Sequence, residues 1–136
     1  MQNSTKALTC RQIRQLLIVE DDATDQLLLQ RKLTKLLTPQ SIAIAATRAQ
    51  LLAALQQPHD LIVTDLHLPD IEEEELLATI AAAQPSTPCV IVSGSAEHAR
   101  RFASGTVIGV VDKGARGALE QCLAPFIGLA EKLPPT

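Results

Sequence analysis

The chain has 136 residues, of which 46% are hydrophobic and 20% are charged, and its net charge is −3. A chain of this length and apolar content can bury a core of its own, so the composition favours one globular domain and excludes a disordered protein. The acidic balance, without Tyr or Trp, provides neither the basic surface nor the stacking rings of a nucleic-acid-binding domain, so we expect no nucleic acid partner.

Apolar runs of strand length alternate along the chain with segments of helical period, which predicts a parallel α/β sheet. A polar N-terminal extension, residues 1–14, precedes the first run. The predicted strands are residues 16–19, 42–45, 61–63, 89–92 and 107–111. Because these runs are continuous rather than alternating, we expect helices to cover both faces of the sheet.

One helix is expected after each strand. Leucines at helical spacing predict the first two, over about 27–37 and 51–55, with Thr47 as N-cap of the second. The third should begin after Pro69 and Asp70, with four consecutive Glu residues near the positive end of its dipole. The fourth is short, and the fifth ends at a pair of prolines. Their expected ranges are 96–103 and 115–133, which leaves 134–136 as a tail or the start of a linker.

Two features of the chain bear on its location. The longest uncharged stretch is interrupted by polar residues and prolines, so no membrane-spanning segment is expected. The first fourteen residues lack the apolar core of a secretory signal, which predicts a cytoplasmic protein.

The isolated cysteines and two of the histidines suggest no chemistry of their own. Cys10, Cys89 and Cys122 are odd in number and widely spaced, as expected for reduced thiols that pack as small hydrophobic residues. We expect His59 and His98 at the surface.

Polar residues that can carry chemistry follow four of the predicted strands. Glu20 and Asp21 follow the first strand, Asp65 the third, Ser93 the fourth and Lys113 the fifth. Open parallel sheets bind ligands outside the carboxyl ends of their strands, and in the doubly wound order 2-1-3-4-5 the first and third strands are neighbours. In that order these side chains would converge in one cleft.

Such a cleft would need a cation. Two carboxylates about 4 Å apart repel by about 4 kcal/mol at an effective dielectric constant of about 20. Oxygen ligands alone favour Mg²⁺, which accepts one or two carboxylates and keeps water or phosphate oxygens in its other positions. Any one acidic residue after a strand more often faces water, but five polar residues that together follow four separate apolar runs favour a site.

The same segments resemble the receiver domains of two-component response regulators over about residues 15–133. The motifs that carry the resemblance are LIVEDD at 17–22, LIVTDLHLP at 61–69, VIVSG at 90–94 and DK at 112–113. The resemblance implies a flavodoxin-like fold. The expected fold class is therefore α/β: a single three-layer doubly wound domain with a five-stranded parallel sheet in the order 2-1-3-4-5 and five helices.

The resemblance also implies roles for the residues of the cleft. Asp65 is the expected phosphoacceptor, with Ser93 and Lys113 acting on the phosphoryl oxygens. Mg²⁺ is expected on Asp21, on Asp65 and on the backbone carbonyl of His67, with Glu20 acting mainly through water.

These roles imply a signalling function rather than a turnover enzyme. The phosphoryl group would come from a phosphohistidine on a histidine kinase or a histidine phosphotransfer protein. The domain would catalyse only its own phosphorylation and dephosphorylation, and would then change an output surface that a downstream effector protein or domain reads. The oligomeric state stays open, with a homodimer as one option.

Three positions depart from the family pattern. Val110 stands where many receivers carry an aromatic residue, Gly114 replaces a proline after Lys113, and Glu73 replaces a glycine. A trans peptide after Lys113 is therefore expected, because a cis bond without proline costs about 2.5 to 4 kcal/mol. The departures keep open a degenerate receiver that binds proteins without being phosphorylated.

A hydrolase of the haloacid dehalogenase type is disfavoured. Such enzymes use a second Asp, two residues after the nucleophile, as their general acid, and His67 stands at that position.

Overall fold

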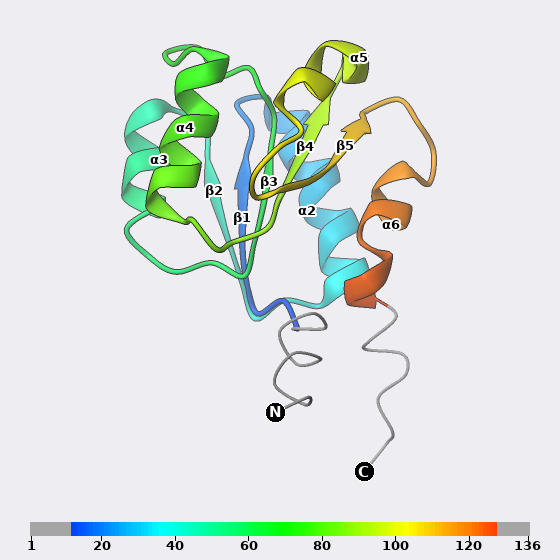
Figure 1. Cartoon of the computed structure of the whole chain (residues 1–136). Coiled ribbons are helices and arrows are strands. Elements are labelled where there is room, and N and C mark those ends of the chain that lie inside the picture. Colours follow the sequence, from blue (N-terminus) through cyan, green and yellow to red (C-terminus); the bar gives the residue numbers. More distant parts are fainter. Residues whose placement is uncertain (1–11, 128–136) are drawn as a thin grey trace, which may run out of the picture.

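The computed structural model describes residues 12–127, which form a parallel sheet with helices on both faces (Figure 1). The strand order is β2-β1-β3-β4-β5, and every neighbouring pair is parallel. The strands are β1 Gln15–Val19, β2 Ser41–Ala45, β3 Leu61–Thr64, β4 Cys89–Ser93 and β5 Val107–Asp112. The predicted three-layer α/β fold with the order 2-1-3-4-5 is confirmed.

The helices divide between the two faces of this sheet. They are α2 Ala23–Leu37, α3 Arg48–Ala54, α4 Glu73–Ala83, α5 Ala96–Ala99 and α6 Ala118–Cys122, with a 3-10 helix, η1 Arg100–Phe102, directly after α5. Helices α2 and α6 lie on one face, and α3 and α4 on the other (Figure 1). None of these helices is both long and apolar enough to cross a bilayer.

Successive residues of the central strands enter two different cores, which explains why the strand sequences are continuously apolar. From β1, Ile18 packs with Leu33 of α2 on one face. Its neighbour Val19 packs on the other face with Leu51 and Leu76, from α3 and α4. The first of these cores also includes Ile13, so the packed part of the chain extends at least to this residue.

Side chains cap the first two helices at their amino ends. The side chain of Asp22 accepts a hydrogen bond from the Asp25 N–H at 2.8 Å, and Thr47 Oγ1 accepts one from Gln50 at 3.2 Å. Asp22 directly follows Glu20 and Asp21, so α2 begins at Ala23 and its first turn lies beside the cleft.

The last helix differs from the prediction. A single helix was expected over 115–133, but α6 covers only Ala118–Cys122, and Leu123 interrupts the helix before a second helical turn at 124–127. Pro125 accounts for the interruption, because a proline lacks the N–H that would bond the preceding turn and its ring clashes with that turn. The rest of the predicted range lies outside the described residues.

The other helices lie where they were predicted, although α2 and α3 begin four and three residues before the leucine pattern indicated. The short fourth helix is one turn of α-helix, α5, extended by η1. Helix α4 starts at Glu73 with three Glu residues in its first turn. The peptide after Lys113 is trans, since no cis peptide occurs in the described residues.

The isolated cysteines and histidines lie in different environments. Cys89 is buried and Cys122 is half-buried, both as free thiols, and Cys10 lies outside the described residues. His98 is exposed as expected. The expected surface position of His59 is wrong, because its side chain is buried and its Nε2 lies 2.8 Å from the carbonyl oxygen of Ala54.

Candidate functional site

The candidate residues lie at the carboxyl ends of adjacent strands, where backbone hydrogen bonds continue the sheet past its last strand residues. The Glu20 N–H donates to Ala45 at 3.0 Å, and the Asp65 N–H donates to Val19 at 2.8 Å. On the other side, the Lys113 N–H donates to the carbonyl of Ser93 at 2.9 Å. These bonds fix the backbone from which each side chain enters the cleft.

Three carboxylates meet at this edge of the sheet. One carboxylate oxygen from each of Glu20, Asp21 and Asp65 lies within 4.8 Å of the other two. The side chains of Glu20 and Asp65 are buried, with 1% and 5% of each residue exposed, whereas Asp21 is exposed. This set of oxygen donors, open to solvent on one side, fits the requirements of Mg²⁺.

Lys113 provides the positive charge of the cleft. Its Nζ lies 2.8 Å from Glu20 Oε1 and 3.0 Å from Asp65 Oδ2. A third carboxylate, Asp25 from the first turn of α2, also lies 2.8 Å from Nζ. One ammonium group is therefore shared by three carboxylates.

The burial of these charges changes their proton affinities. Burial raises the pKa of Glu20 to about 7, although hydrogen bonds from Lys113 and from the backbone N–H of Asp22 act in the opposite direction. Burial alone would lower the pKa of Lys113, but its hydrogen bonds to Asp25, Glu20 and Asp65 outweigh burial and raise that pKa above its ordinary value. Lys113 is thus charged at neutral pH, while Glu20 is close to its titration midpoint.

Further hydrogen bonds hold the two buried carboxylates in place. Asp65 Oδ1 accepts the N–H of Leu66 at 2.7 Å, so both of its oxygens are engaged. Glu20 Oε2 accepts the N–H of Asp22 at 3.2 Å, and the backbone carbonyl of Glu20 accepts Gln26 Nε2 at 2.7 Å. Both buried carboxylates are therefore held by backbone N–H groups as well as by Lys113.

Ser93 and His67 lie at the same edge but face other partners. Ser93 is buried at the end of β4, and its Oγ accepts the N–H of Ser95 at 3.0 Å. The imidazole of His67 is exposed, and its Nδ1 lies 3.4 Å from Glu73 Oε2. The side chain of His67 therefore contacts Glu73 and is not one of the three clustered carboxylate ligands.

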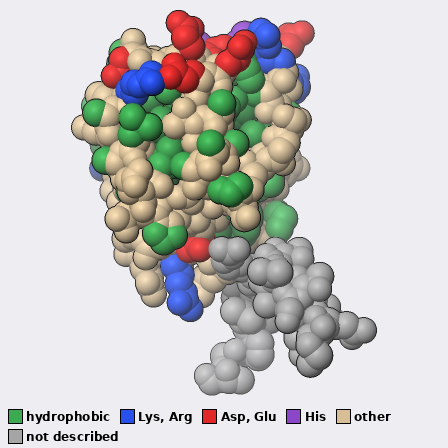
Figure 2. All heavy atoms as spheres, turned by 60° about the vertical axis from the view of Figure 1, so that its left-hand side comes forward, with side chains coloured by type: hydrophobic (Ala, Val, Ile, Leu, Met, Phe, Trp, Pro, Cys, Tyr) green, Lys and Arg blue, Asp and Glu red, His purple; other side chains and the backbone are tan. Residues whose placement is uncertain are grey.

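Two features of this edge were not predicted from the sequence. Asp25 was missed as a partner of Lys113, although its position in the first turn of the helix after the acidic pair could have indicated it. Glu73 joins two histidines, because its Oε1 lies 2.8 Å from His98 Nε2 while its Oε2 faces His67. Figure 2 shows acidic, basic and histidine side chains gathered at this end of the molecule.

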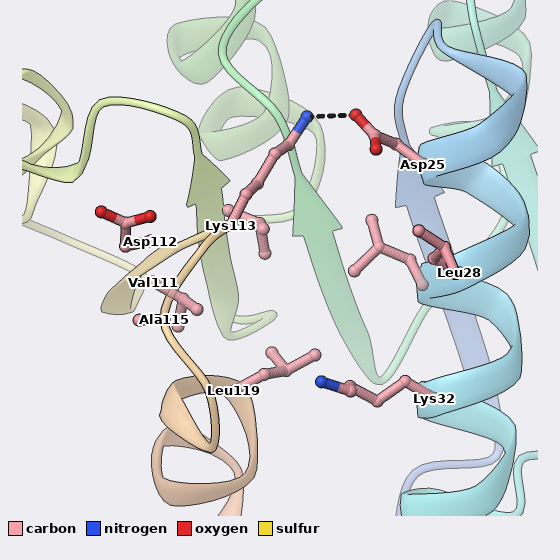
Figure 3. Close-up of a pocket in the computed structure, with 10 residues that line it drawn as sticks. Asp25, Leu28, Lys32, Val111, Asp112, Lys113, Ala115 and Leu119 are labelled. Carbon is pink, nitrogen blue, oxygen red and sulfur yellow. Dashed lines mark hydrogen bonds and ion pairs between the residues drawn. The ribbon is translucent and has the colours of Figure 1, made fainter.

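A cavity of about 230 Å³ opens beside Lys113, between α2 and the segment that joins β5 to α6 (Figure 3). Its apolar lining includes Leu28, Val111 and Leu119, and Asp25 and Lys113 form its upper end. The acidic cleft is therefore continuous with a partly apolar groove.

Comparisons with known proteins agree with this geometry. The family model of the response regulator receiver domain matches residues 16–123. A search of curated proteins finds no match. Among solved structures, the receiver domain of the sensor histidine kinase PA1611 from Pseudomonas aeruginosa PAO1, with a magnesium ion in its active-site cleft, is 23% identical. That match covers 85% of this chain and 98% of the other, with a TM-score of 0.68.

Two further structures carry the groups expected at such a site. The phosphorylated cyanobacterial phytochrome response regulator RcpA is 26% identical, with a TM-score of 0.65 and coverage of 87% of this chain and 91% of that one. TrrA from Thermotoga maritima, in complex with Mg²⁺-BeF, is 16% identical, with a TM-score of 0.69 and coverage of 84% and 98%. The family model spans most of the chain, and this protein therefore belongs to the response regulator receiver domains of two-component systems.

Proposed function

We propose that this domain accepts a phosphoryl group on Asp65 from a phosphohistidine of a histidine kinase or histidine phosphotransfer protein. The observation that carries the proposal is the position of Lys113 Nζ, 3.0 Å from Asp65 Oδ2, beside the three carboxylates that can hold a cation. In this proposal the domain meets its phosphodonor in the cytoplasm, and an effector protein or domain recognises the surface that phosphorylation changes.

In the proposed reaction Asp65 is the nucleophile. A carboxylate oxygen of Asp65 attacks phosphorus, an O–P bond forms, the N–P bond breaks, and the electron pair stays on the imidazole of the donor. The Leu66 N–H, 2.7 Å from Asp65 Oδ1, orients the carboxylate. Lys113 supplies a fixed positive charge for the phosphoryl oxygens.

Asp21, Asp65 and the backbone carbonyl of His67 would hold Mg²⁺, with Glu20 acting through water. The ion supplies charge neutralisation for the transferred group.

Ser93 would report the modification. In this proposal its hydroxyl turns from the Ser95 N–H to a phosphoryl oxygen, and the loop that leads into α5 moves with it. With Val110 in place of an aromatic residue, this loop rather than a ring rotation would alter the output surface.

Intact mass after treatment with Mg²⁺ and acetyl phosphate tests the proposal. We expect one added phosphoryl group per chain, none in Asp65→Asn, and no sustained release of phosphate at high turnover. A folded protein that gains no mass would instead support the degenerate receiver, and rapid continuous phosphate release would support a hydrolase.

A further inference from the structure

Asp25 is the one contact of Lys113 that the proposed function does not use. Its Oδ2 lies 2.8 Å from Nζ, as close as Glu20 and closer than Asp65. Figure 3 shows the Lys113 side chain reaching across from the β5 side to meet Asp25 on α2. The side chain of Asp25 is 35% exposed, against 1% for Glu20 and 7% for Asp65, so it forms the solvent side of the cluster.

The three contacts use the whole hydrogen-bonding capacity of Lys113, because an ammonium group has three N–H donors and no acceptor. A phosphoryl oxygen can bind Nζ only by replacing one of these carboxylates. If Asp25 is the one replaced, its contact has to break whenever the phosphoryl group is captured.

If Asp25 instead keeps its contact with Lys113, it still makes binding of the phosphoryl group less favourable. Two oxygens that both accept from one ammonium lie within about 6 Å of each other, given N–H···O distances near 2.8 Å. The phosphoryl group brings about two negative charges to that position, and like charges at this separation repel. Asp25 opposes phosphoryl capture in either arrangement.

We propose that Asp25 is a positioning residue that holds Lys113 toward α2 and thereby restrains phosphoryl capture at Asp65. This role rests on the proposed function, whose site it regulates. A purely structural role for Asp25, as an acidic residue in the first turn of α2, would affect helix stability without changing phosphoryl capture.

A matched pair of substitutions separates the two roles. Asp25→Asn removes the negative charge that pairs with Lys113, while Asp22→Asn removes one charge from the same helix end and keeps a good N-cap. Asp22 is exposed, and no hydrogen bond or ion pair of its side chain with Lys113 is found in the described structure. Both variants should fold, which thermal unfolding checks.

The test measures the dissociation constant of beryllofluoride, with Mg²⁺ at saturation, and the rate of phosphorylation by acetyl phosphate. We expect Asp25→Asn to bind beryllofluoride roughly three- to tenfold more tightly and to react faster by a similar factor. Asp22→Asn should change either quantity by less than about twofold, as expected for an exposed charge without a contact. In a Lys113→Met background the effect of Asp25→Asn should shrink.

A readout without phosphoryl chemistry accompanies these measurements. The NMR signals of the Lys113 side chain should shift in Asp25→Asn and remain near their wild-type values in Asp22→Asn. If wild-type protein binds no beryllofluoride, the proposed function fails. If wild-type protein binds it and the two variants are alike in affinity, rate and Lys113 signals, only the role of Asp25 is overturned.

Discussion

The two ends of the sheet both bury polar side chains, but they do so with different chemistry. At the carboxyl end, Glu20 and Asp65 are buried as acids and share Lys113. At the amino end, two of the buried polar side chains carry no charge: Gln84 Nε2 donates to the carbonyl of Gln57 at 2.8 Å, and Thr87 Oγ1 donates to Gln84 Oε1 at 3.0 Å. Most of the hydrogen bonds of Gln84 and Thr87 are made with backbone groups.

The difference separates stability from function within one fold. Neutral side chains that join two loops, α3–β3 and α4–β4, through backbone contacts hold those loops in one arrangement at little electrostatic cost. A cluster with more buried carboxylates than positive groups is electrostatically unfavourable, and binding of a cation reduces this cost. The amino end is therefore expected to stabilise the domain, and the carboxyl end to respond to what it binds.

Gln84→Ala tests the amino end and should have the largest effect on stability. The change leaves the carbonyl of Gln57, the hydroxyl of Thr87 and the N–H of His59 without this partner in a buried region. We expect the free energy of unfolding in urea to fall by about 3 kcal/mol. The phosphorylation rate of the folded fraction should stay the same; a stable variant that is slow to accept phosphate would contradict the separation.

Lys113→Met tests the carboxyl end. Without Mg²⁺, the change leaves Glu20 and Asp65 buried beside each other without their ammonium partner. We expect a loss of about 2.5 kcal/mol in the free energy of unfolding, less than for a fully enclosed pair because water reaches Lys113. Saturating Mg²⁺ should recover part of the loss. Equal losses with and without Mg²⁺ would mean that the cleft does not depend on its cations.

The pH dependence of stability should arise from Glu20. Its folded pKa of about 7 lies above the ordinary value of 4.5, so between these values the folded chain keeps a proton that the unfolded chain releases. The free energy of unfolding of metal-free protein should therefore fall as pH rises from about 4.5 to about 7, by on the order of 2 kcal/mol, and level off above.

Urea titrations of wild type and Glu20→Gln across that range check this expectation. The wild-type decline should be reduced in the variant, which cannot ionise at this position. Parallel profiles would assign the decline to another group.

The cluster of His67, Glu73 and His98 sharpens the comparison, because its polar side chains contact one another without being buried. His67 is 68% exposed and His98 is 40% exposed. Glu73→Gln should change the free energy of unfolding by no more than about 0.5 kcal/mol, and by less at high salt. A loss as large as that of Lys113→Met would show that exposure does not account for the contrast.

The sequence was most informative where consecutive residues are buried, because such runs are visible in the sequence itself. The run from Leu16 to Val19 predicted a strand because both of its faces are covered, and the polar residues that follow such runs were found for the same reason. The strand order added what the residues alone could not. Glu20 and Asp65 follow neighbouring strands, whereas Lys113 follows a strand two positions from that of Asp65 and three from that of Glu20.

Features that depend on the reach of a side chain or the approach of loops were not predictable. Asp25 lies just before the helix predicted over about 27–37, and its bond to Lys113 depends on where the end of an extended lysine side chain lies. His59 looked like a surface residue because its burial depends on the loop that carries Gln84 and Thr87. The interruption at Leu123, by contrast, could have been predicted from Pro125, which lies inside the predicted helix.

The buried acids of the cleft have a consequence for the lifetime of the chain. A cation that binds the folded cleft and not the unfolded polypeptide adds a free energy of unfolding that grows with the logarithm of its concentration. Proteases cut chains chiefly when they open, so ion supply would set how long each molecule survives. Depletion of the ion would then remove the protein as well as silence it.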